Sequence, residues 1–279
     1  MDLLGPLPIE TRNHHSYPYG FCFTISDIRG KCLEFAARGR LARTVNGKMA
    51  ASLPPVLPLY VDGAERASVA AEHIDVLDPA TQNVLCKVPC TTQEEMEAIV
   101  ASAVAAQKKW REVPVQQRVR CLIKFQTLLV ANKDDIAECM VAENGKTKAD
   151  ALGDITRGIE VVEHSLSMPS LMMGETIEQI STNMDTKTIR QPLGVVAGIA
   201  PFNFPAMIPL WMLPIAVGTG NAFILKPSEK VPTASHKIVK LATEAGVTPG
   251  VISILHGGVA AVNFAVKSVC ARLCECVLV

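Results

Sequence analysis

The sequence predicts an α/β fold in which helices flank an open, mainly parallel sheet. Residues 191–225 carry no charge, and within them 194–200 and 222–226 are short apolar runs bounded by proline or glycine. A third such run covers 251–255. Runs of this length are typical of strands buried on both faces of a parallel sheet. Helical segments between the runs complete a β-α-β-α-β order over 194–255, which predicts parallel pairing.

The uncharged segment is also long enough to cross a bilayer, for which about 20 apolar residues suffice. Four prolines interrupt its interior, at Pro201, Pro205, Pro209 and Pro214. Each interior proline removes a helix hydrogen bond, and several such breaks are hard to satisfy in lipid. We therefore expect a strand, a helix of short kinked pieces from Pro205 to Val217, and a second strand, with no membrane partner.

Composition restricts the class of protein. The chain has 279 residues, 49% of them hydrophobic, and a formal net charge of zero. This length can hold one large domain or two smaller ones, each with a sizeable core. There is no basic stripe and there are few aromatic residues, so we expect no nucleic-acid partner.

The cysteines indicate a reducing compartment. Their number is odd and no CxxC occurs: Cys22, Cys32, Cys86, Cys90, Cys121, Cys139, Cys270, Cys274 and Cys276. Buried free thiols fit this pattern better than a disulfide framework. The last three cysteines lack a second ligand pair, so we expect no metal site.

Residues 1–55 differ from the rest of the chain. Between residues 35 and 55 there are four basic residues and no acidic residue. Arginine-rich, acid-poor composition is typical of a mitochondrial transit peptide, which predicts a mitochondrial location and otherwise a cytoplasmic one. The alternatives are a disordered extension and a start at Met49.

Several further elements are expected. Residues 57–63 and 73–78 have strand patterns, and 84–88 is the hairpin partner of the second strand. Thr91 or Thr92 caps a helix that ends near Trp110. The other expected helices are 115–131, 133–144, 148–166 and 234–245, and residues 174–190 form an exposed hairpin.

Polar residues follow the predicted strand 222–226. Lys226 and Glu229 lie at its carboxyl end, where open α/β sheets bind ligands. A surface ion pair is the alternative interpretation. No GxGxxG motif occurs, and the glycines at 218 and 220 fit a plain turn.

Five strings carry a resemblance to a known family. They are Asp78-Pro-Ala-Thr81, Glu143-Asn-Gly-Lys146, Ser170-Leu-Met-Met-Gly-Glu175, Ala200-Pro-Phe-Asn-Phe-Pro-Ala-Met-Ile-Pro-Leu-Trp-Met212 and Lys226-Pro-Ser-Glu229. Over residues 57–264 the chain resembles the aldehyde dehydrogenase superfamily, and within it the CoA-acylating methylmalonate- and malonate-semialdehyde dehydrogenases. The resemblance implies that 56–264 is a partial NAD-binding domain with a Rossmann-like open parallel sheet.

The resemblance also implies roles for particular residues. The matching asparagine of the family, here Asn203, donates its amide to the oxyanion formed when a thiolate attacks the aldehyde, a task that suits a neutral donor. The alternative is a turn-forming asparagine. Lys226 and Glu229 would hold the adenosine ribose, and a carboxylate there favours NAD over NADP.

Other roles are carried over by position. Ala200, Phe202 and Lys230 would be neighbours of the cofactor, although the family often has arginine at the position of Lys230. Arg157 would bind the substrate carboxylate, which a guanidinium fork suits. The alternative for Arg157 is an ion pair with Asp154 or Glu160 on a helix surface.

The resemblance ends near Phe264. Residues 265–279 form a divergent tail, and the family's nucleophilic cysteine, second carboxylate-binding arginine and C-terminal oligomerisation strand have no counterpart in the sequence. We therefore expect a domain truncated before the catalytic domain.

The implied function is NAD-dependent, CoA-acylating oxidation of methylmalonate or malonate semialdehyde to propionyl-CoA or acetyl-CoA, in valine and thymine catabolism. Its partners would be NAD, coenzyme A and a small semialdehyde. The family forms homo-oligomers, which is doubtful for this chain. We expect the chain to be inactive alone, and the alternative is a non-catalytic binding or interaction fragment.

Overall fold

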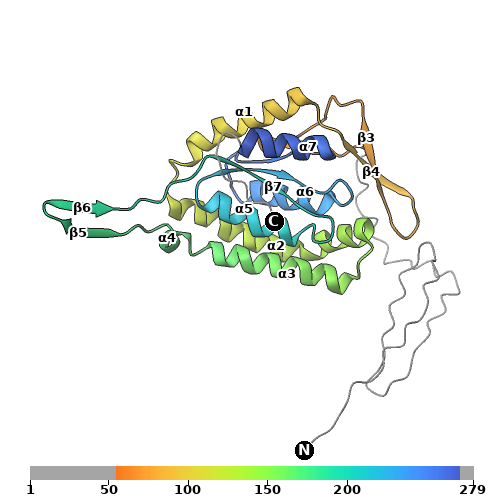
Figure 1. Ribbon diagram of the computed structural model, residues 1–279. Coiled ribbons are helices and arrows are strands. Elements are labelled where there is room, and N and C mark those ends of the chain that lie inside the picture. The colour runs from red at the N-terminus through yellow and green to blue at the C-terminus, as the bar shows by residue number, and fades with distance from the viewer. Residues whose placement is uncertain (1–54, 271–279) are drawn as a thin grey trace, which may run out of the picture. The chain divides into compact units, whose positions relative to one another are not determined.

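The computed structural model describes residues 55–270, and they build layers of helices around one five-stranded sheet (Figure 1). The strand order is β2-β1-β9-β8-β7. The strands are β1 (Leu59–Val61), β2 (Ala64–Arg66), β7 (Val195–Ile199), β8 (Ala222–Lys226) and β9 (Ile252–Ile254). The last three confirm the strands predicted for the β-α-β-α-β segment.

The sheet is mixed. β7, β8 and β9 run parallel, with Ile199 paired with Lys226 and Leu225 with Ile254. β1 lies antiparallel to β9, and β2 continues as a hairpin with β1. The α/β class and the parallel half of the sheet are therefore confirmed, and two antiparallel strands extend it.

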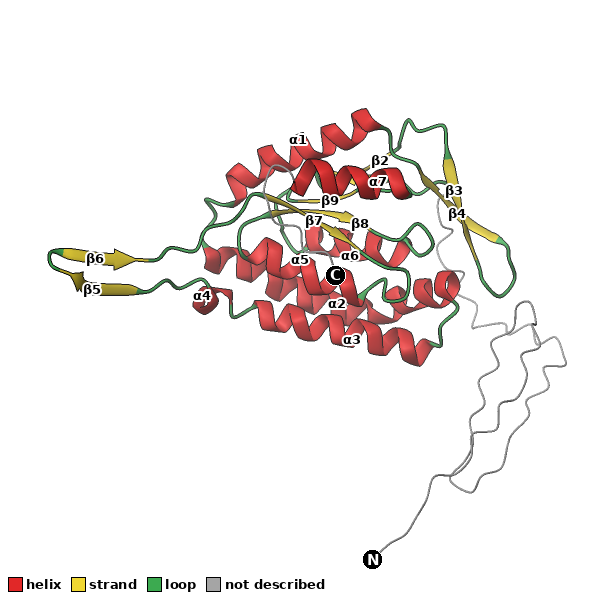
Figure 2. Ribbon diagram, viewed as in Figure 1, coloured by secondary structure: helices red, strands yellow, loops and turns green. Residues whose placement is uncertain are grey.

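Side chains on the central strand alternate between two cores because successive residues of a strand point to opposite faces. Ile224 packs with α1 (Gln93–Trp110) and α7 (Val259–Phe264). Phe223 and Leu225 pack with the helices of the other face. Figure 2 shows these helices, α5 (Met207–Gly218) and α6 (Thr233–Glu244) next to the sheet and α2 (Val115–Asn144) and α3 (Lys148–Ser165) beyond them.

The start of α1 agrees with the sequence prediction. Thr92 accepts a hydrogen bond from the Glu95 backbone N–H at 3.3 Å, and Glu95 accepts one from the Thr92 N–H at 3.0 Å. This reciprocal capping box satisfies two N–H groups that the helix itself leaves without partners.

The prediction of two helices over 115–131 and 133–144 is wrong, because α2 is one helix of 30 residues. Its middle contains neither glycine nor proline, and Asn132 donates to the Leu128 carbonyl within the helix at 2.8 Å. Asp134 and Asp135, which we expected in a first turn, instead pair with Lys148 and Lys237.

Two features of the uncharged segment also differ from expectation. α5 is one continuous helix: Pro209 lies in its first turn, where its missing N–H costs no hydrogen bond, and the helix also continues through Pro214. β7 is the last strand of the described sheet, and Val196, Ala197 and Ile199 are only partly buried on it.

The remaining elements lie outside the main sheet. β3 (His73–Leu77) and β4 (Val84–Pro89) form the expected hairpin. The second expected hairpin is β5 (Thr176–Ser181) with β6 (Met184–Lys187); it stands away from the helices in Figure 1, and nearly all its residues are exposed. A single turn, α4 (Met168–Leu171), precedes it.

The uncharged segment is shared among β7, α5 and β8, and no helix within residues 55–270 has the length and apolar character to cross a bilayer. Residues 265–270 form a π-helical turn. The expected leader, including Met49, and the tail cysteines Cys274 and Cys276 lie outside the described residues.

Candidate functional site

The loops that follow β7 and β8 leave the same edge of the sheet as neighbours. The two strands are parallel, and the Ala200 N–H donates to the Lys226 carbonyl oxygen at 3.0 Å. The first loop carries Phe202 and Asn203, and the second carries Glu229 and Lys230. The parallel pairing therefore places the predicted oxyanion and cofactor residues at adjacent strand ends.

Lys226 and Glu229 form an ion pair. The Lys226 Nζ donates to Glu229 Oε2 at 2.9 Å, and the two side chains are 5% and 31% exposed. Burial would raise the pKa of Glu229, but the hydrogen bond from Lys226 and the charges of Lys226 and Lys230 hold it below its ordinary value. Glu229 is therefore an anion at neutral pH. Its Oε1 accepts no hydrogen bond from any other residue that the structure describes.

Phe202 and Lys230 approach each other across the two loops. The Lys230 Nζ lies 5.2 Å from the centre of the Phe202 ring, within the range of a cation–π contact. The ring is 54% exposed. The structure thus brings Ala200, Phe202, Lys226, Glu229 and Lys230 together at one corner.

Asn203 is held through its main chain. The Lys146 Nζ donates to the Asn203 carbonyl oxygen at 2.8 Å, and Asn144 Nδ2 donates to the Phe202 carbonyl oxygen at 2.7 Å. The Asn203 residue is exposed, and its side-chain amide makes no hydrogen bond with a described residue. An amide that is free while its backbone is fixed can serve as a donor to a ligand.

A buried ion pair supports this loop. The Lys146 Nζ lies 3.1 Å from Asp154 Oδ2, with side-chain exposures of 13% and 1%. Asp154 Oδ1 accepts from the Met207 N–H at 2.7 Å, at the start of α5. Burial raises the pKa of Asp154, and the hydrogen bond and charge of Lys146 oppose that shift.

Arg157 is the one predicted site residue that lies outside the two strand ends and their loops. It is exposed on α3, one turn after Asp154, and within the described part of the chain its guanidinium makes no hydrogen bond or ion pair. Within residues 55–270 Arg157 therefore forms no direct ion pair with Asp154 or Glu160, although its charge also opposes the rise in the pKa of Asp154. The guanidinium donors of Arg157 are available to a ligand.

Sequence reasoning missed Asn144, Lys146 and Asp154 as residues of the site. The first two belong to the string Glu143–Lys146, which supported the family resemblance but was assigned no role. Asp154 was considered only as a partner of Arg157. A lysine directly after the helix-ending Gly145 was the signal available, but its partner lies 57 residues away in sequence.

Four cysteines of the described chain are poor nucleophiles. Burial raises the pKa of all four free thiols, Cys86, Cys90, Cys121 and Cys139, and that of Cys86 reaches about 12. The thiolate is the reactive form, so these environments disfavour attack on a carbonyl. Residues 55–270 also contain no group of three side chains placed to hold a metal ion.

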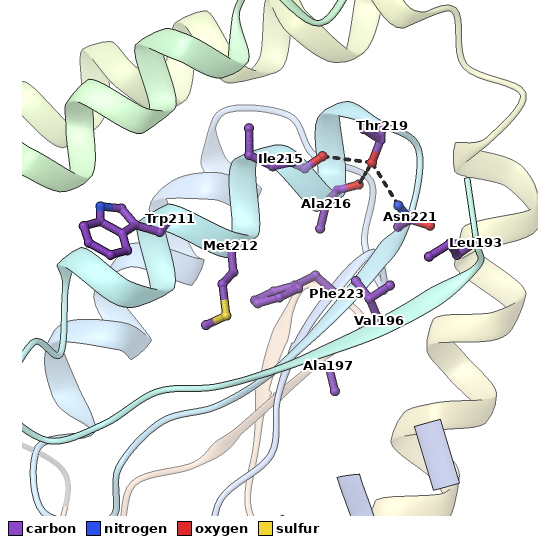
Figure 3. A pocket seen from close by; sticks show the side chains of 10 residues that line it. All are labelled: Leu193, Val196, Ala197, Trp211, Met212, Ile215, Ala216, Thr219, Asn221 and Phe223. Carbon is purple, nitrogen blue, oxygen red and sulfur yellow. Dashed lines mark hydrogen bonds between the residues drawn. The ribbon is translucent and has the colours of Figure 1, made fainter. Parts of the chain in front are cut away.

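A pocket of about 310 Å³ lies between β7 and α5 (Figure 3), and none of the predicted site residues lines it. Its lining is mainly apolar, with Trp211 and Met212 from the helix and Val196 from the strand. The Thr219 hydroxyl and the Asn221 amide there are hydrogen-bonded to each other at 2.9 Å. The pocket offers little polar chemistry, so it is not the candidate site.

The fold and these residues agree with a family comparison. Residues 66–270 match the family model described as "Aldehyde dehydrogenase family". This match covers more than half of the chain, and the chain belongs to the aldehyde dehydrogenase family.

Individual relatives show which members of the family the chain is similar to. The chain is 50% identical over 218 residues to methylmalonate-semialdehyde dehydrogenase [acylating], mitochondrial, of Arabidopsis thaliana, covering 78% of this chain and 35% of that protein. It is 47% identical over 198 residues to malonate-semialdehyde dehydrogenase 3 of Geobacillus kaustophilus, covering 71% of this chain and 41% of the relative. The chain therefore spans less than half the length of these curated relatives.

A solved structure supports the same comparison. A Sinorhizobium meliloti 1021 protein assigned as a methylmalonate-semialdehyde dehydrogenase, crystallised with NAD, superposes with a TM-score of 0.74 at 40% identity. The superposition covers 76% of this chain and 43% of that one.

Proposed function

We propose that this chain supplies the cofactor-binding part of an NAD-dependent, CoA-acylating dehydrogenase of methylmalonate or malonate semialdehyde. The single observation that carries the proposal is the ionised Glu229 beside Lys226 at the carboxyl end of β8, with one carboxylate oxygen free. The names of the relatives support the substrate class, and NAD in the superposed structure supports the cofactor.

The corner fits an adenosine ribose. The free Oε1 of Glu229 can accept a hydrogen bond from a ribose hydroxyl, and the Lys226 ammonium holds the carboxylate in place. A 2′-phosphate would meet the negative charge of Glu229, which favours NAD over NADP. Ala200, Phe202 and Lys230 are the proposed neighbours of the cofactor. When bound, NAD supplies the hydride acceptor.

Two other residues are proposed to act on the semialdehyde. The free amide of Asn203 would donate to the oxygen of the aldehyde as negative charge develops on it. The free guanidinium of Arg157 would bind the substrate carboxylate in a bidentate manner. Coenzyme A is the proposed acceptor of the acyl group.

The proposal extends to location and assembly. Relatives named mitochondrial, together with the arginine-rich N-terminal composition, support a mitochondrial location. Ile177, Ile180 and Met184 are at least half exposed on the β5–β6 hairpin, which supports assembly of copies of this chain.

A second candidate is a non-catalytic binding or interaction fragment. The observation that favours it is the raised pKa of all four described thiols, which leaves Asn203 without an activated thiol among them. Under this candidate the chain binds NAD but produces no NADH from semialdehyde and coenzyme A.

Calorimetry on the purified chain tests the proposed function. We expect NAD to bind more tightly than NADP, and Glu229→Gln to weaken NAD binding about tenfold because a charged acceptor is lost. Glu244→Gln, at an exposed glutamate of α6, is the matched control and should change nothing. Equal affinity of the wild-type chain for NAD and NADP would contradict the assignment. NADH formation in the same samples separates the two candidates.

A further inference from the structure

The loop that carries Asn203 contains no regular secondary structure between β7 and α5. Its end is also open, because Ala206, the residue before α5, provides no side-chain cap. Uncapped helix N-termini expose N–H groups that need partners, and an irregular loop has few bonds of its own. The conformation of the loop therefore depends on groups from elsewhere in the chain.

Lys146 provides the first of these groups. An ammonium has three N–H donors, and here one meets the Asn203 carbonyl oxygen, one meets Asp154, and the ring of Phe204 lies 5.2 Å from the Nζ. The Lys146 side chain makes all three contacts and is only 13% exposed. Charge-assisted hydrogen bonds are stronger than neutral ones, so this contact restrains the main chain at Asn203.

Asp154 provides the second group that holds the loop. One carboxylate oxygen receives the Lys146 ammonium, and the other receives the first N–H of α5. It therefore acts as the helix cap that Ala206 cannot provide. One ion pair thus holds both the middle and the end of the loop.

The helix that carries Asp154, α3, packs closely against α5. One turn later on α3, a Cβ added to Gly158 would lie 2.6 Å from Leu210 Cδ1 of α5. Residue 154 contacts residue 207, and residue 158, further along α3, lies next to residue 210, further along α5. The two helices therefore run in the same direction and approach closely. A carboxylate on such a helix has little freedom to move relative to α5.

We propose that Lys146 and Asp154 are positioning residues that fix the main chain of the 200–206 loop, and so hold Asn203 and Phe202 where the ligand needs them. This inference rests on the proposed function of that loop. Neither residue is placed to touch the reacting atoms. Lys146 acts through the carbonyl of Asn203, and Asp154 acts through the start of α5.

Two variants and a matched control test the proposal on the purified chain. Lys146→Met keeps the apolar stem and removes the ammonium, whereas Lys146→Arg keeps the charge and the donors. Lys148→Met is the control. Lys148 lies two residues after Lys146, and its ion-pair partner Asp134 is exposed. The readouts are hydrogen exchange of the amides of 202–208, NAD affinity by calorimetry, and Tm.

For Lys146→Met we expect exchange of these amides to accelerate about tenfold relative to the rest of the chain, and NAD affinity to fall about tenfold. Lys146→Arg should keep most of the wild-type protection from exchange and most of the NAD affinity. Lys148→Met should resemble the wild type in both measurements. If Lys146→Met does not fold, Lys146→Gln keeps one neutral donor for Asn203 and gives the same comparison.

The outcomes distinguish the positioning role of Lys146 from the proposed function. Unchanged exchange at 202–208 in Lys146→Met with NAD affinity within twofold of the wild type overturns the positioning role. A uniform rise in exchange across the chain, without a local excess, would reduce Lys146 to a general stabiliser and also overturns it. A wild-type chain that binds no NAD overturns the proposed function, while the exchange comparison still decides the role of Lys146.

Discussion

The starts of α5 and α6 are capped by buried carboxylates from outside each helix, and the two carboxylates differ in their partners. Asp154 binds the Met207 N–H and an ammonium, that of Lys146. Glu143 binds the Thr233 N–H at 3.1 Å and the Thr233 hydroxyl, but no ammonium directly. The pKa of Glu143 is raised to about 7, chiefly by burial.

The difference shows what a cation adds to a buried cap. Both carboxylates lose hydration, which raises the pKa of each, but only at Asp154 does a hydrogen-bonded cation oppose this shift. The start of α5 is therefore held by a charge pair whose members depend on each other. The start of α6 is held by a group that changes protonation near neutral pH.

The largest effect is expected from Asp154→Ala. This change leaves the nearly buried Lys146 ammonium without its anion and the Met207 N–H without its cap. Breaking a buried pair by removing one partner costs about 3–5 kcal/mol of unfolding free energy. Urea denaturation measures it. Asp134→Ala removes an exposed partner of Lys148 and should cost about 1 kcal/mol or less; equal losses for both variants would contradict the comparison.

Glu143→Gln should show its effect in the pH dependence of stability. The folded pKa of about 7 lies above the unfolded value of 4.5, so the stability contributed by the protonated group is present below pH 4.5 and is lost as pH rises to 7. Relative to the wild type, the variant should gain on the order of 3 kcal/mol across this window.

Denaturation at a series of pH values measures this gain. Glu138→Gln, at an exposed glutamate of the same helix, is the control and should show no such trend. A difference between Glu143→Gln and the wild type that stays constant from pH 4.5 to 8 would mean that Glu143 titrates normally and that its cap resembles that of an exposed carboxylate.

The smallest effect is expected from Asn144→Ala, which removes a neutral contact to the loop before α5. Loss of the hydrogen bond to the Phe202 carbonyl should cost about 1 kcal/mol and accelerate exchange near Phe202. Asn132→Ala removes a similar amide-to-carbonyl bond inside α2, so it should leave the loop unchanged. Faster loop exchange in both variants would show that the loop responds to any weakening of α2.

Local chemistry allowed much of the fold to be predicted. The capping box at Thr92, the helix end at Gly145 and the runs that became β7, β8 and β9 depend on residues within a few positions of each other. The pairing of Lys226 with Glu229 is likewise local, since the two are three residues apart. Such features are visible in a sequence because their energies involve neighbours along the chain.

The sequence did not reveal which weak helix boundaries would be overridden. The segment near Lys133 resembled a break, yet α2 passes through it, because packing along a 30-residue helix outweighs a local preference for polar residues at a helix start. α5 likewise continues through Pro214, a residue that is buried within the helix.

By itself the sequence determined the α/β class, the strand ends and the residues Asn203, Lys226 and Glu229 that lie there. Only the tertiary structure decided how the loop of Asn203 is held. The contacts from Lys146 to Asn203 and from Asp154 to Met207 join residues 57 and 53 positions apart. They exist because α3 packs closely against α5, and no periodicity or motif along the chain specifies that distance between helices.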